Sequence, residues 1–381
     1  MYTHFHALRS ATLLMVAVFT VAGLLLVPGS TSFAEEGTRV AVPGGVYDKP
    51  FIKKEGRGAI IGGYMDHEFF WSDKGRTFDQ HRFVPFINSM VADRILVMAE
   101  IEFEHGGFVK GAKNGDTDGE IKIEYATLDI SFAPFLSFRG GVILSPLGRF
   151  NLTHDSPQRD LTNRPLVARQ IIPTTLSEAG MGFFGTFFLG AASLVGYEIY
   201  VVNGFNEKII GDGTTRIRKG RGSQKSDNND GKSLVGRVNF SPILGLDVGG
   251  SFHVGAYDDE GEDYLTIVSG DVDFVSGPIH LRGNFAFASI DGAPENSDSQ
   301  FGVYGQIGCH FLRGSIPTFP DSVFTGTLRF DFIDFEDSDE TRYTLGLNWR
   351  PVEDTVLKLD YEMYDEDEDS DGLIFSVASY F

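Results

Sequence analysis

Cysteine is nearly absent from this chain of 381 residues, in which Cys309 is the single example. One cysteine cannot form a disulfide within the chain, so an exported form of the protein needs another source of stability. A closed, hydrogen-bonded β-barrel is one such source. Cys309 shares the apolar face of its segment with Ile307 and Phe311, which indicates a small apolar surface residue rather than a reactive thiol.

Long apolar runs are also scarce. The exception is Ala11–Pro28, which follows a weakly basic start and precedes Ser32 and Ala34. Small residues at this spacing are typical of the cleavage site of an export signal. The sequence therefore predicts three parts: a cleavable signal peptide at 1–34, an N-terminal periplasmic segment at 35–57 and a barrel domain at 58–381. An uncleaved anchor is the alternative for the first part, and a helical membrane protein is excluded because no other run reaches the ~20 apolar residues of a spanning helix.

Basic residues are in the minority, with 32 Lys and Arg against 53 Asp and Glu and a formal net charge of −21. This balance excludes a basic face for nucleic acid, so no nucleic-acid partner is predicted. Much of the acid lies in the runs 258–263, 334–340 and 365–371. Runs of like charge must stay in water, so we expect loops there rather than barrel wall.

No metal-binding pattern stands out. The run 365–371 could hold Ca²⁺ through carboxylate oxygens, but it lacks the glycine and ligand spacing of an EF-hand loop. A solvated loop is the simpler interpretation, and divalent ions bridging to anionic lipid headgroups are an intermediate one. The nine histidines show no paired spacing. The sequence therefore predicts no metal site and no cofactor.

Glycine, phenylalanine and tyrosine are abundant, at 46, 34 and 13 residues. From residue 58 onward the chain breaks into short segments in which apolar and polar residues alternate. In one of them Leu357, Leu359 and Tyr361 share a face, and Lys358 and Asp360 take the other. Period two is typical of a strand with one face in lipid and one facing water, and the aromatic girdles of a membrane barrel require many Phe and Tyr.

The fold class predicted from this pattern is all-β, an antiparallel transmembrane β-barrel of about sixteen strands, with fourteen or eighteen as alternatives. The connections alternate between short turns and longer loops, with Trp71–Thr77 and 106–119 among the longer ones, as in barrels with periplasmic turns and outer loops. The expected strands are 58–70, 78–90, 93–105, 120–133, 135–146, 178–190, 193–203, 232–241, 245–257, 264–276, 278–290, 299–312, 322–334, 340–350, 354–365 and 372–381.

The chain ends in a segment where Leu373, Phe375, Val377 and Phe381 share one face. A terminal Phe resembles the C-terminal insertion signal of bacterial outer-membrane proteins, although Ser379 departs from the usual apolar series. A soluble edge strand could also end this way. Together with the export signal, this ending predicts a location in the outer membrane of a Gram-negative-type bacterium, in contact with membrane lipid and lipopolysaccharide.

The connection 145–177 differs from the acidic loops because it is basic and contains four prolines. Connections of this length are usually functional or disordered, and its composition is not that of a disordered segment. We expect it to fold into the lumen, narrow the pore and bring guanidinium groups to the constriction. The arginines that it supplies are Arg149, Arg159, Arg164 and Arg169.

Three motifs carry a family resemblance: Arg139–Gly148, which reads RGGVILSPLG, Arg164–Arg169, which reads RPLVAR, and the turn Asn348–Pro351. Through these motifs the chain, chiefly in the stretch Phe138–Phe184, resembles the phosphate-selective porin superfamily. The resemblance implies a strand that ends in a Pro-x-Gly turn and is followed by a loop folded into the channel. The ladder of basic residues that sets selectivity in that family cannot be carried over, because no motif places it here.

Alternation also predicts which wall charges face the lumen. They carry both signs: Arg139, Arg237, Arg282, Arg329, Lys358, Asp247, Asp271 and Asp360. A pore lined by both signs has a transverse field that orients polar solutes and screens ions. The alternative is that these charges pair across strands and simply fill a watery lumen.

The sequence therefore predicts a porin for passive diffusion of small hydrophilic solutes or ions, leaning to anions because charge at the narrowest point dominates. A homotrimer is one expected assembly. The alternative function is a non-transporting barrel that acts as adhesin, receptor or envelope anchor through its acidic outer loops. An enzyme is not predicted: Ser145, His154 and Asp155 are close in sequence, but nothing indicates that a base activates a nucleophile there.

Overall fold

The computed structural model describes residues 59–72, 75–106, 119–211, 213–222, 224–365 and 371–381. The predicted signal peptide 1–34 and periplasmic segment 35–57 lie outside these residues. So do most of the predicted loop 106–119 and the centre of the acidic run 365–371.

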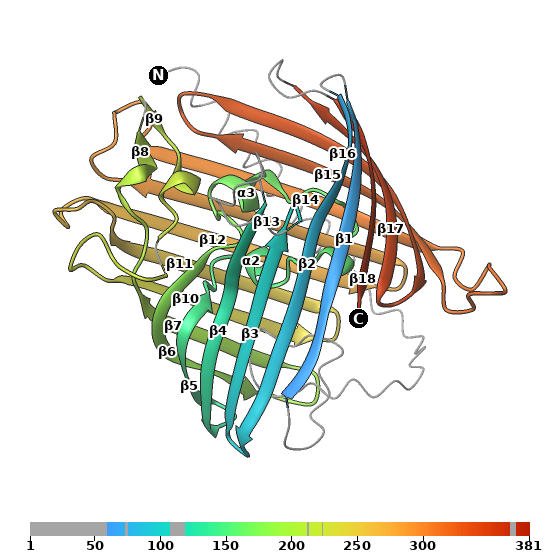
Figure 1. The fold of residues 1–381 in the computed structure, drawn as a ribbon, viewed down its shortest axis with the longest axis horizontal. Helices are drawn as coiled ribbons and strands as arrows, with labels where there is room; N and C mark the ends of the chain where they lie inside the picture. Colours follow the sequence, from blue (N-terminus) through green and yellow to red (C-terminus); the bar gives the residue numbers. More distant parts are fainter. Residues whose placement is uncertain (1–58, 73–74, 107–118, 212, 223, 366–370) are drawn as a thin grey trace. The chain divides into compact units, whose positions relative to one another are not determined.

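Sixteen antiparallel strands close into a barrel, and each pairs with its neighbours along the chain (Figure 1). The strands are β1 (Ala59–Ser72), β2 (Gly75–Ala92), β3 (Ile95–Glu104), β4 (Glu120–Ala133), β5 (Leu136–Leu144), β6 (Ser177–Phe188), β7 (Leu194–Val202), β10 (Ser233–Ile243), β11 (Leu246–Ala256), β12 (Tyr264–Ser276), β13 (Ile279–Ile290), β14 (Ser299–Phe311), β15 (Val323–Asp334), β16 (Asp339–Val352), β17 (Thr355–Tyr364) and β18 (Gly372–Tyr380). The predicted fold class is confirmed, and no strand end differs from its predicted position by more than three residues.

The remaining elements are short and lie in the two longest connections. Between β5 and β6 are α2 (Arg149–Leu152), η1 (Ser156–Gln158) and α3 (Leu166–Gln170); between β7 and β10 are η2 (Glu207–Ile209), the pair β8 (Ile210–Gly211) and β9 (Thr214–Thr215), and η3 (Ile217–Gly220). None of the described helices is long and apolar enough to cross a membrane.

The barrel closes where the last strand meets the first. β18 pairs with β1 from Tyr64↔Tyr380 to Ser72↔Gly372. Beyond this ladder the terminal residue adds two backbone hydrogen bonds: Phe381 N–H donates to the Gly63 carbonyl at 2.9 Å, and Gly63 N–H donates to the Phe381 carbonyl at 3.2 Å. The Phe381 ring stacks on Phe83 of β2, with centroids 5.5 Å apart. The terminal Phe therefore ties three strands together.

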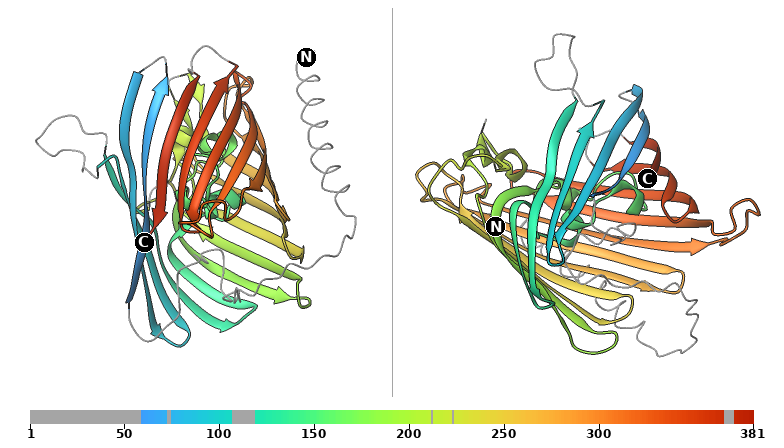
Figure 2. Two further views of the ribbon diagram at one scale, coloured as in Figure 1. Left: turned by 90° about the vertical axis from the view of Figure 1, so that its right-hand side faces the viewer. Right: turned by 60° about the horizontal axis from the view of Figure 1, so that its bottom comes forward.

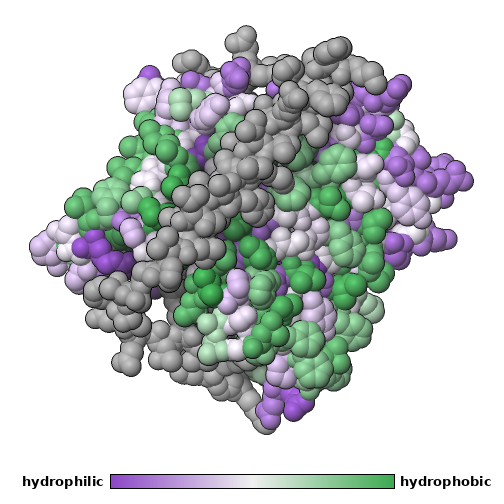
Figure 3. Space-filling model, turned by 180° about the vertical axis from the view of Figure 1, so that it is seen from behind, coloured by the Kyte–Doolittle hydropathy of each residue, from purple (hydrophilic) through white to green (hydrophobic). Residues whose placement is uncertain are grey.

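The exposed faces of the strands are largely apolar, and the buried faces carry most of the polar and charged wall residues. In β17, Lys358 and Asp360 are 1% exposed, whereas Leu359 and Tyr361 are 43% and 41% exposed. On the face drawn in Figure 3, hydrophobic side chains cover much of the wall and the most hydrophilic ones lie toward its margins. Such a surface suits lipid, where a Lys or Arg at mid-bilayer costs about 2–4 kcal/mol.

One predicted loop is wrong. Trp71–Thr77 was expected to be a longer connection, but β1 and β2 continue to the pair Ser72↔Gly75 and are joined by residues 73–74 alone. Cross-strand side-chain contacts explain the extension. Arg76 places its guanidinium 4.5 Å from the Trp71 ring centroid. Such pairs stabilise a ladder by roughly 0.2–1 kcal/mol each.

An apolar cluster fills part of the barrel interior. It joins the two longest connections to the buried faces of β12, β13, β14 and β15. Its members from the connections are Leu147, Leu166, Val167, Ile171, Ile172, Leu176, Phe205, Ile209 and Ile217, and those from the four strands are Leu265, Ile267, Ala286, Ala288, Ile290, Tyr304 and Ile333. The two connections are thus packed against the wall rather than extended into solvent.

Candidate functional site

The connection between β5 and β6, residues 145–176, contacts opposite sides of the barrel; we call it the β5–β6 segment. Near its start, Gly148 N–H donates to Ser251 Oγ on β11 at 2.8 Å. Further along, Ser156 Oγ donates to Asp66 on β1. In the ring of sixteen strands β11 lies eight positions from β1, which is the far side. Figures 1 and 2 show the helices of this segment among the strands from three directions.

Charged wall residues hold the backbone of the segment. Four cations donate to its carbonyls: Arg329 Nη1 to Asn163 at 2.9 Å, Arg342 Nη2 to Arg164 at 2.7 Å, Arg350 Nη1 to Pro157 at 2.6 Å and Lys358 Nζ to Ser156 at 2.7 Å. Three carboxylates accept its N–H groups: Asp360 from Thr162 at 2.6 Å, Asp331 from Leu166 at 3.0 Å and Asp271 from Arg149 at 3.2 Å. Charge-assisted hydrogen bonds are roughly twice as strong as neutral ones. The path of the segment is therefore set by backbone contacts with wall charges.

A polar cavity of about 90 Å³ lies between the segment and strands β12–β15. Seven charged side chains line it: Arg149, Arg159, Arg282, Arg329, Asp160, Asp271 and Asp273. The rest of its lining includes Gln158, Asn163, Asn284, Tyr304 and Gln306. This lining of guanidinium, carboxylate, amide and phenol groups suits small hydrophilic solutes or ions better than apolar ones.

The charges around the cavity form an interlocked set. Arg149 Nη1 lies 2.6 Å from Asp247 Oδ2, and its Nε lies 3.5 Å from Asp273 Oδ2. Arg282 contacts Asp273 at 3.4 Å and Asp160 at 3.5 Å. The Arg149 and Arg282 side chains are 36% and 26% exposed, against 15% for Asp273 and 4% for Asp160. Positive charge is therefore more accessible than negative charge at this point.

Burial and neighbouring charges shift the pKa values of segment residues. Burial alone would raise the pKa of Asp160, but the guanidiniums of Arg282 and Arg350 outweigh it and hold the pKa below its usual value. Burial lowers the pKa of Arg164 to about 9, and repulsion from Arg82 adds to the effect. Asp160 is therefore ionised and Arg164 is cationic at neutral pH.

The four arginines predicted for the constriction occupy different surroundings. Arg149 and Arg159 line the cavity, but the Arg159 side chain is only 5% exposed and donates to a carbonyl of its own segment at 2.5 Å. Arg164 donates to the Thr174 carbonyl at 2.5 Å. Arg169 is exposed and lies outside the described cavity lining. Among the four, Arg149 has the most open access to the cavity.

The predicted wall charges lie on inner faces of their strands, and each has a partner. The pairs are Arg139 with Asp129 at 2.6 Å, Arg237 with Asp271 at 2.5 Å, Arg282 with Asp273 at 3.4 Å, Arg329 with Asp331 at 2.8 Å, Asp247 with Arg149 at 2.6 Å, Asp360 with the Thr162 N–H at 2.6 Å and Lys358 with the Ser156 carbonyl at 2.7 Å. Most of the wall charges that face the lumen are thus neutralised by a partner. The guanidiniums of Arg149 and Arg282 differ because they are also partly exposed.

The sequence analysis missed some basic wall residues, among them Arg342 and Arg350. Arg342 has 0% exposure, and Arg350 donates to the Pro157 carbonyl of the β5–β6 segment. Alternation could have identified both, because Tyr343 and Trp349 point outward and their neighbours must point inward. What alternation could not reveal is that both guanidiniums bind backbone carbonyls of a distant segment.

The Ser145, His154 and Asp155 grouping does not form a nucleophile with its base. His154 Nε2 contacts Glu124 of β4, and its Nδ1 lies 2.9 Å from the Asn151 carbonyl. Both ring nitrogens are therefore engaged elsewhere than at Ser145.

Comparison with known proteins gives a distant relative and a set of similar folds. No family model matches the chain. An uncharacterized protein of Aquifex aeolicus is 32% identical over 212 residues, which is 54% of this chain and 47% of that protein, so the match spans about half of the relative's length.

Many solved structures are similar to this chain, and the following three are among them. OmpT of Vibrio cholerae in its trimer form has a TM-score of 0.54 at 10% identity, covering 85% of this chain and 99% of its own. The outer-membrane channel DcaP of Acinetobacter baumannii has a TM-score of 0.52 at 14% identity, covering 87% and 99%. The anion-selective porin of Comamonas acidovorans has a TM-score of 0.56 at 12% identity, covering 85% and 99%.

Identities of 10–14% establish the fold and no more. The predicted porin-like barrel is confirmed at that level, and the predicted outer-membrane location agrees with it. The chain has the fold of the outer-membrane porins.

Proposed function

We propose that this protein is a porin in the outer membrane of a Gram-negative-type bacterium, through which small hydrophilic solutes and ions diffuse passively. The observation that carries the proposal is the charged cavity between the β5–β6 segment and strands β12–β15, with Arg149 and Arg282 partly open to water. A segment bound to opposite sides of a barrel restricts the space left for solutes. We place the constriction of the pore at this cavity.

The charges at the constriction support a preference for anions. Among its lining residues four arginines face three aspartates, and the most exposed charged side chains of this set are Arg149 at 36% and Arg282 at 26%. The protein as a whole has a net charge of −21, which favours cations near the mouth. Low-dielectric walls focus the field of the nearest charges on the narrowest part of a channel, so the local balance dominates.

Planar-bilayer recording tests both parts of the proposal. The purified, refolded protein should show step conductance, and a barrel that inserts without conducting would refute the pore. In a salt gradient the reversal potential should indicate anion preference. The double variant Arg149→Ala, Arg282→Ala should shift it toward cations, whereas Arg169→Ala, which removes an exposed arginine outside the cavity lining, should leave it nearly unchanged. Equal shifts in the two variants would contradict the position of the constriction.

A non-transporting barrel remains the competing function, because the apolar cluster inside the barrel reduces the space for water. An adhesin, receptor or envelope anchor would use the acidic outer loops instead, and it would give no step conductance in the same recording. A homotrimer is proposed as the assembly, since one protein of this fold is described in a trimer form. The outer wall of this proposed trimer would contact membrane lipid and lipopolysaccharide.

A further inference from the structure

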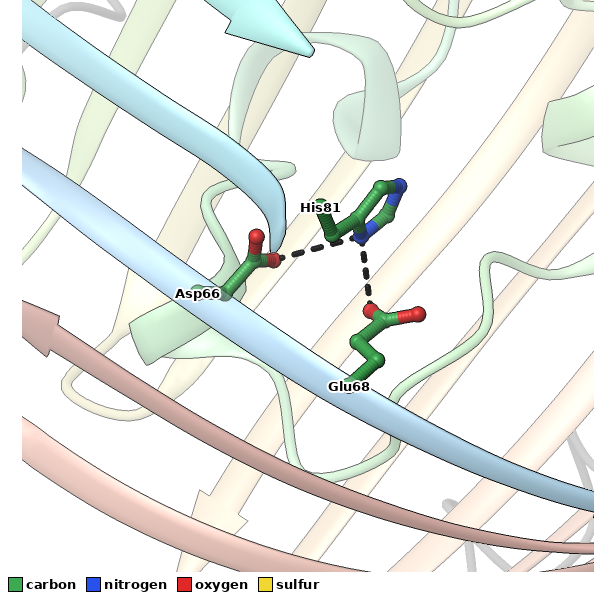
Figure 4. A group of neighbouring side chains, drawn as sticks. All are labelled: Asp66, Glu68 and His81. Atoms are coloured by element: carbon green, nitrogen blue, oxygen red, sulfur yellow. Dashed lines mark hydrogen bonds and ion pairs between the residues drawn. The ribbon is translucent and has the colours of Figure 1, made fainter. Parts of the chain in front are cut away.

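Three side chains of metal-ligating types converge on the inner face of the β1–β2 hairpin (Figure 4). They are Asp66 and Glu68 of β1 and His81 of β2, and their donor atoms all lie within 4.8 Å of one another. His81 Nδ1 is 2.7 Å from Glu68 Oε1 and 3.5 Å from Asp66 Oδ2. Two carboxylates and an imidazole thus face a single point.

A β-bulge creates this arrangement. Asp66 pairs with Arg82, but Glu68 pairs with Asp79, so β2 has one more residue than β1 between these pairs. Arg82 points to the inner face and is 4% exposed, and strict alternation would turn His81 outward. The extra residue turns the His81 side chain inward beside the two carboxylates. Bulges are over-represented next to functional sites because they re-aim a side chain in this way.

One buried oxygen of the cluster, Asp66 Oδ1, has no hydrogen-bond partner among the described residues. Asp66 is 1% exposed. A buried acceptor without a partner costs about 1–3 kcal/mol, and more when it is charged. A cation bound by both oxygens of the Asp66 carboxylate would satisfy this oxygen. The His81 side chain is 18% exposed, which leaves a path for an ion from water.

We propose that Asp66, Glu68 and His81 bind a divalent transition-metal ion, with Zn²⁺ the ion that fits best. Imidazole nitrogen with two carboxylate oxygens is a donor set for Zn²⁺, whereas Ca²⁺ and Mg²⁺ take oxygen ligands. Ligands at ~2.1 Å in a tetrahedron lie about 3.4 Å apart. The 3.5 Å from Nδ1 to Asp66 Oδ2 already has this spacing, and the 2.7 Å to Glu68 lengthens when the metal enters between the two atoms. Water completes the fourth position.

The cluster differs from an ordinary ion pair because His81 contacts two carboxylates. Two other inward histidines have one carboxylate partner each: His253 contacts Glu178 at 3.0 Å, and His280 contacts Asp273 at 3.2 Å. Asp66 also accepts from Ser156 Oγ of the β5–β6 segment. A hydrogen bond of this kind orients a ligating carboxylate. The metal therefore sits where the segment meets β1.

Cobalt spectroscopy on the full-length, refolded protein in detergent tests the site, and the measurement needs no conducting pore. After removal of metals with a chelator, Co²⁺ should bind one per chain with the intense visible absorption of low-coordinate Co²⁺. Ions held by acidic loops are six-coordinate and absorb weakly. Asp66→Asn, Glu68→Gln and His81→Gln should each lose the intense bands, and His280→Gln should retain them. Zn²⁺ should displace Co²⁺.

A second variant keeps the test decisive even where a substitution weakens the fold. In a Cys309→Ser background, His81→Cys retains a ligand, and its thiolate should add a Co²⁺ charge-transfer band in the near ultraviolet. The absence of intense bands in the unmodified protein, or their persistence in His81→Gln, would overturn the proposal. So would a folded His81→Cys variant, judged by its β-sheet circular dichroism, that shows no charge-transfer band.

Discussion

Asp331 lies where the β5–β6 segment meets β15 and β16, and replacing it with asparagine tests how the segment is held. The residue has 0% exposure. Its carboxylate accepts from Arg329 Nε at 2.8 Å, from Arg342 Nη2 at 3.1 Å and from the Leu166 N–H at 3.0 Å. Three donors from three parts of the chain thus depend on one buried negative charge.

Asp331→Asn keeps the shape of the side chain and removes its charge. Removing one partner of a buried ion pair costs about 3–5 kcal/mol, because the other charge is left uncompensated. Glu362 stays 3.3 Å from Arg342 and 3.8 Å from Arg329 and compensates in part. We therefore expect a loss near the lower limit, about 3 kcal/mol of unfolding free energy. This corresponds to roughly a hundredfold change in the unfolding equilibrium.

Urea unfolding in lipid vesicles, under conditions where folding and unfolding curves coincide, measures this loss. The matched control is Asp337→Asn, which breaks an ion pair with Arg216 at 3.1 Å in which both side chains are 23% exposed. Surface pairs contribute about 0–1 kcal/mol, so this change should be small. If Asp331→Asn destabilises the barrel no more than Asp337→Asn does, the buried charge network does not hold the segment.

Two further predictions concern acid and the C-terminus. Because the Asp160 pKa lies below its usual value in the folded protein, its contribution to stability is complete above about pH 4 and is lost as pH falls through the folded pKa. The difference in unfolding free energy between the unmodified protein and Asp160→Asn should shrink on acidification, and a difference independent of pH would contradict this. Phe381→Ala removes the stack on Phe83 and should lower both stability, by about 0.5–1.5 kcal/mol, and the yield of folded protein in the outer membrane. Quantitative heat-modifiability of membrane extracts checks the yield, and an unchanged yield would argue against an insertion signal.

The barrel could be predicted in detail because its signal is local. Leu357, Lys358, Leu359 and Asp360 alternate in the sequence because the outer face meets lipid and the inner face meets polar groups, and this difference repeats in each strand. The strand predicted at 264–276 has the observed bounds Tyr264–Ser276. The prediction of a loop at Trp71–Thr77 was wrong because its signal is not local. A cross-strand contact between Trp71 and Arg76 lengthens the hairpin, and the sequence of one segment alone does not reveal its pairing partner.

The site required tertiary structure because its residues depend on partners far along the chain. The sequence marked Arg149 and Arg164 equally as arginines of a basic, proline-rich connection. Only the fold places Arg149 beside Asp247 and the cavity, and Arg164 against the Thr174 carbonyl. The same holds for His81, which alternation assigns to the outer face and a bulge turns inward. Alternation reports the environment of a strand face, whereas register, bulges and long-range hydrogen bonds decide which side chains meet.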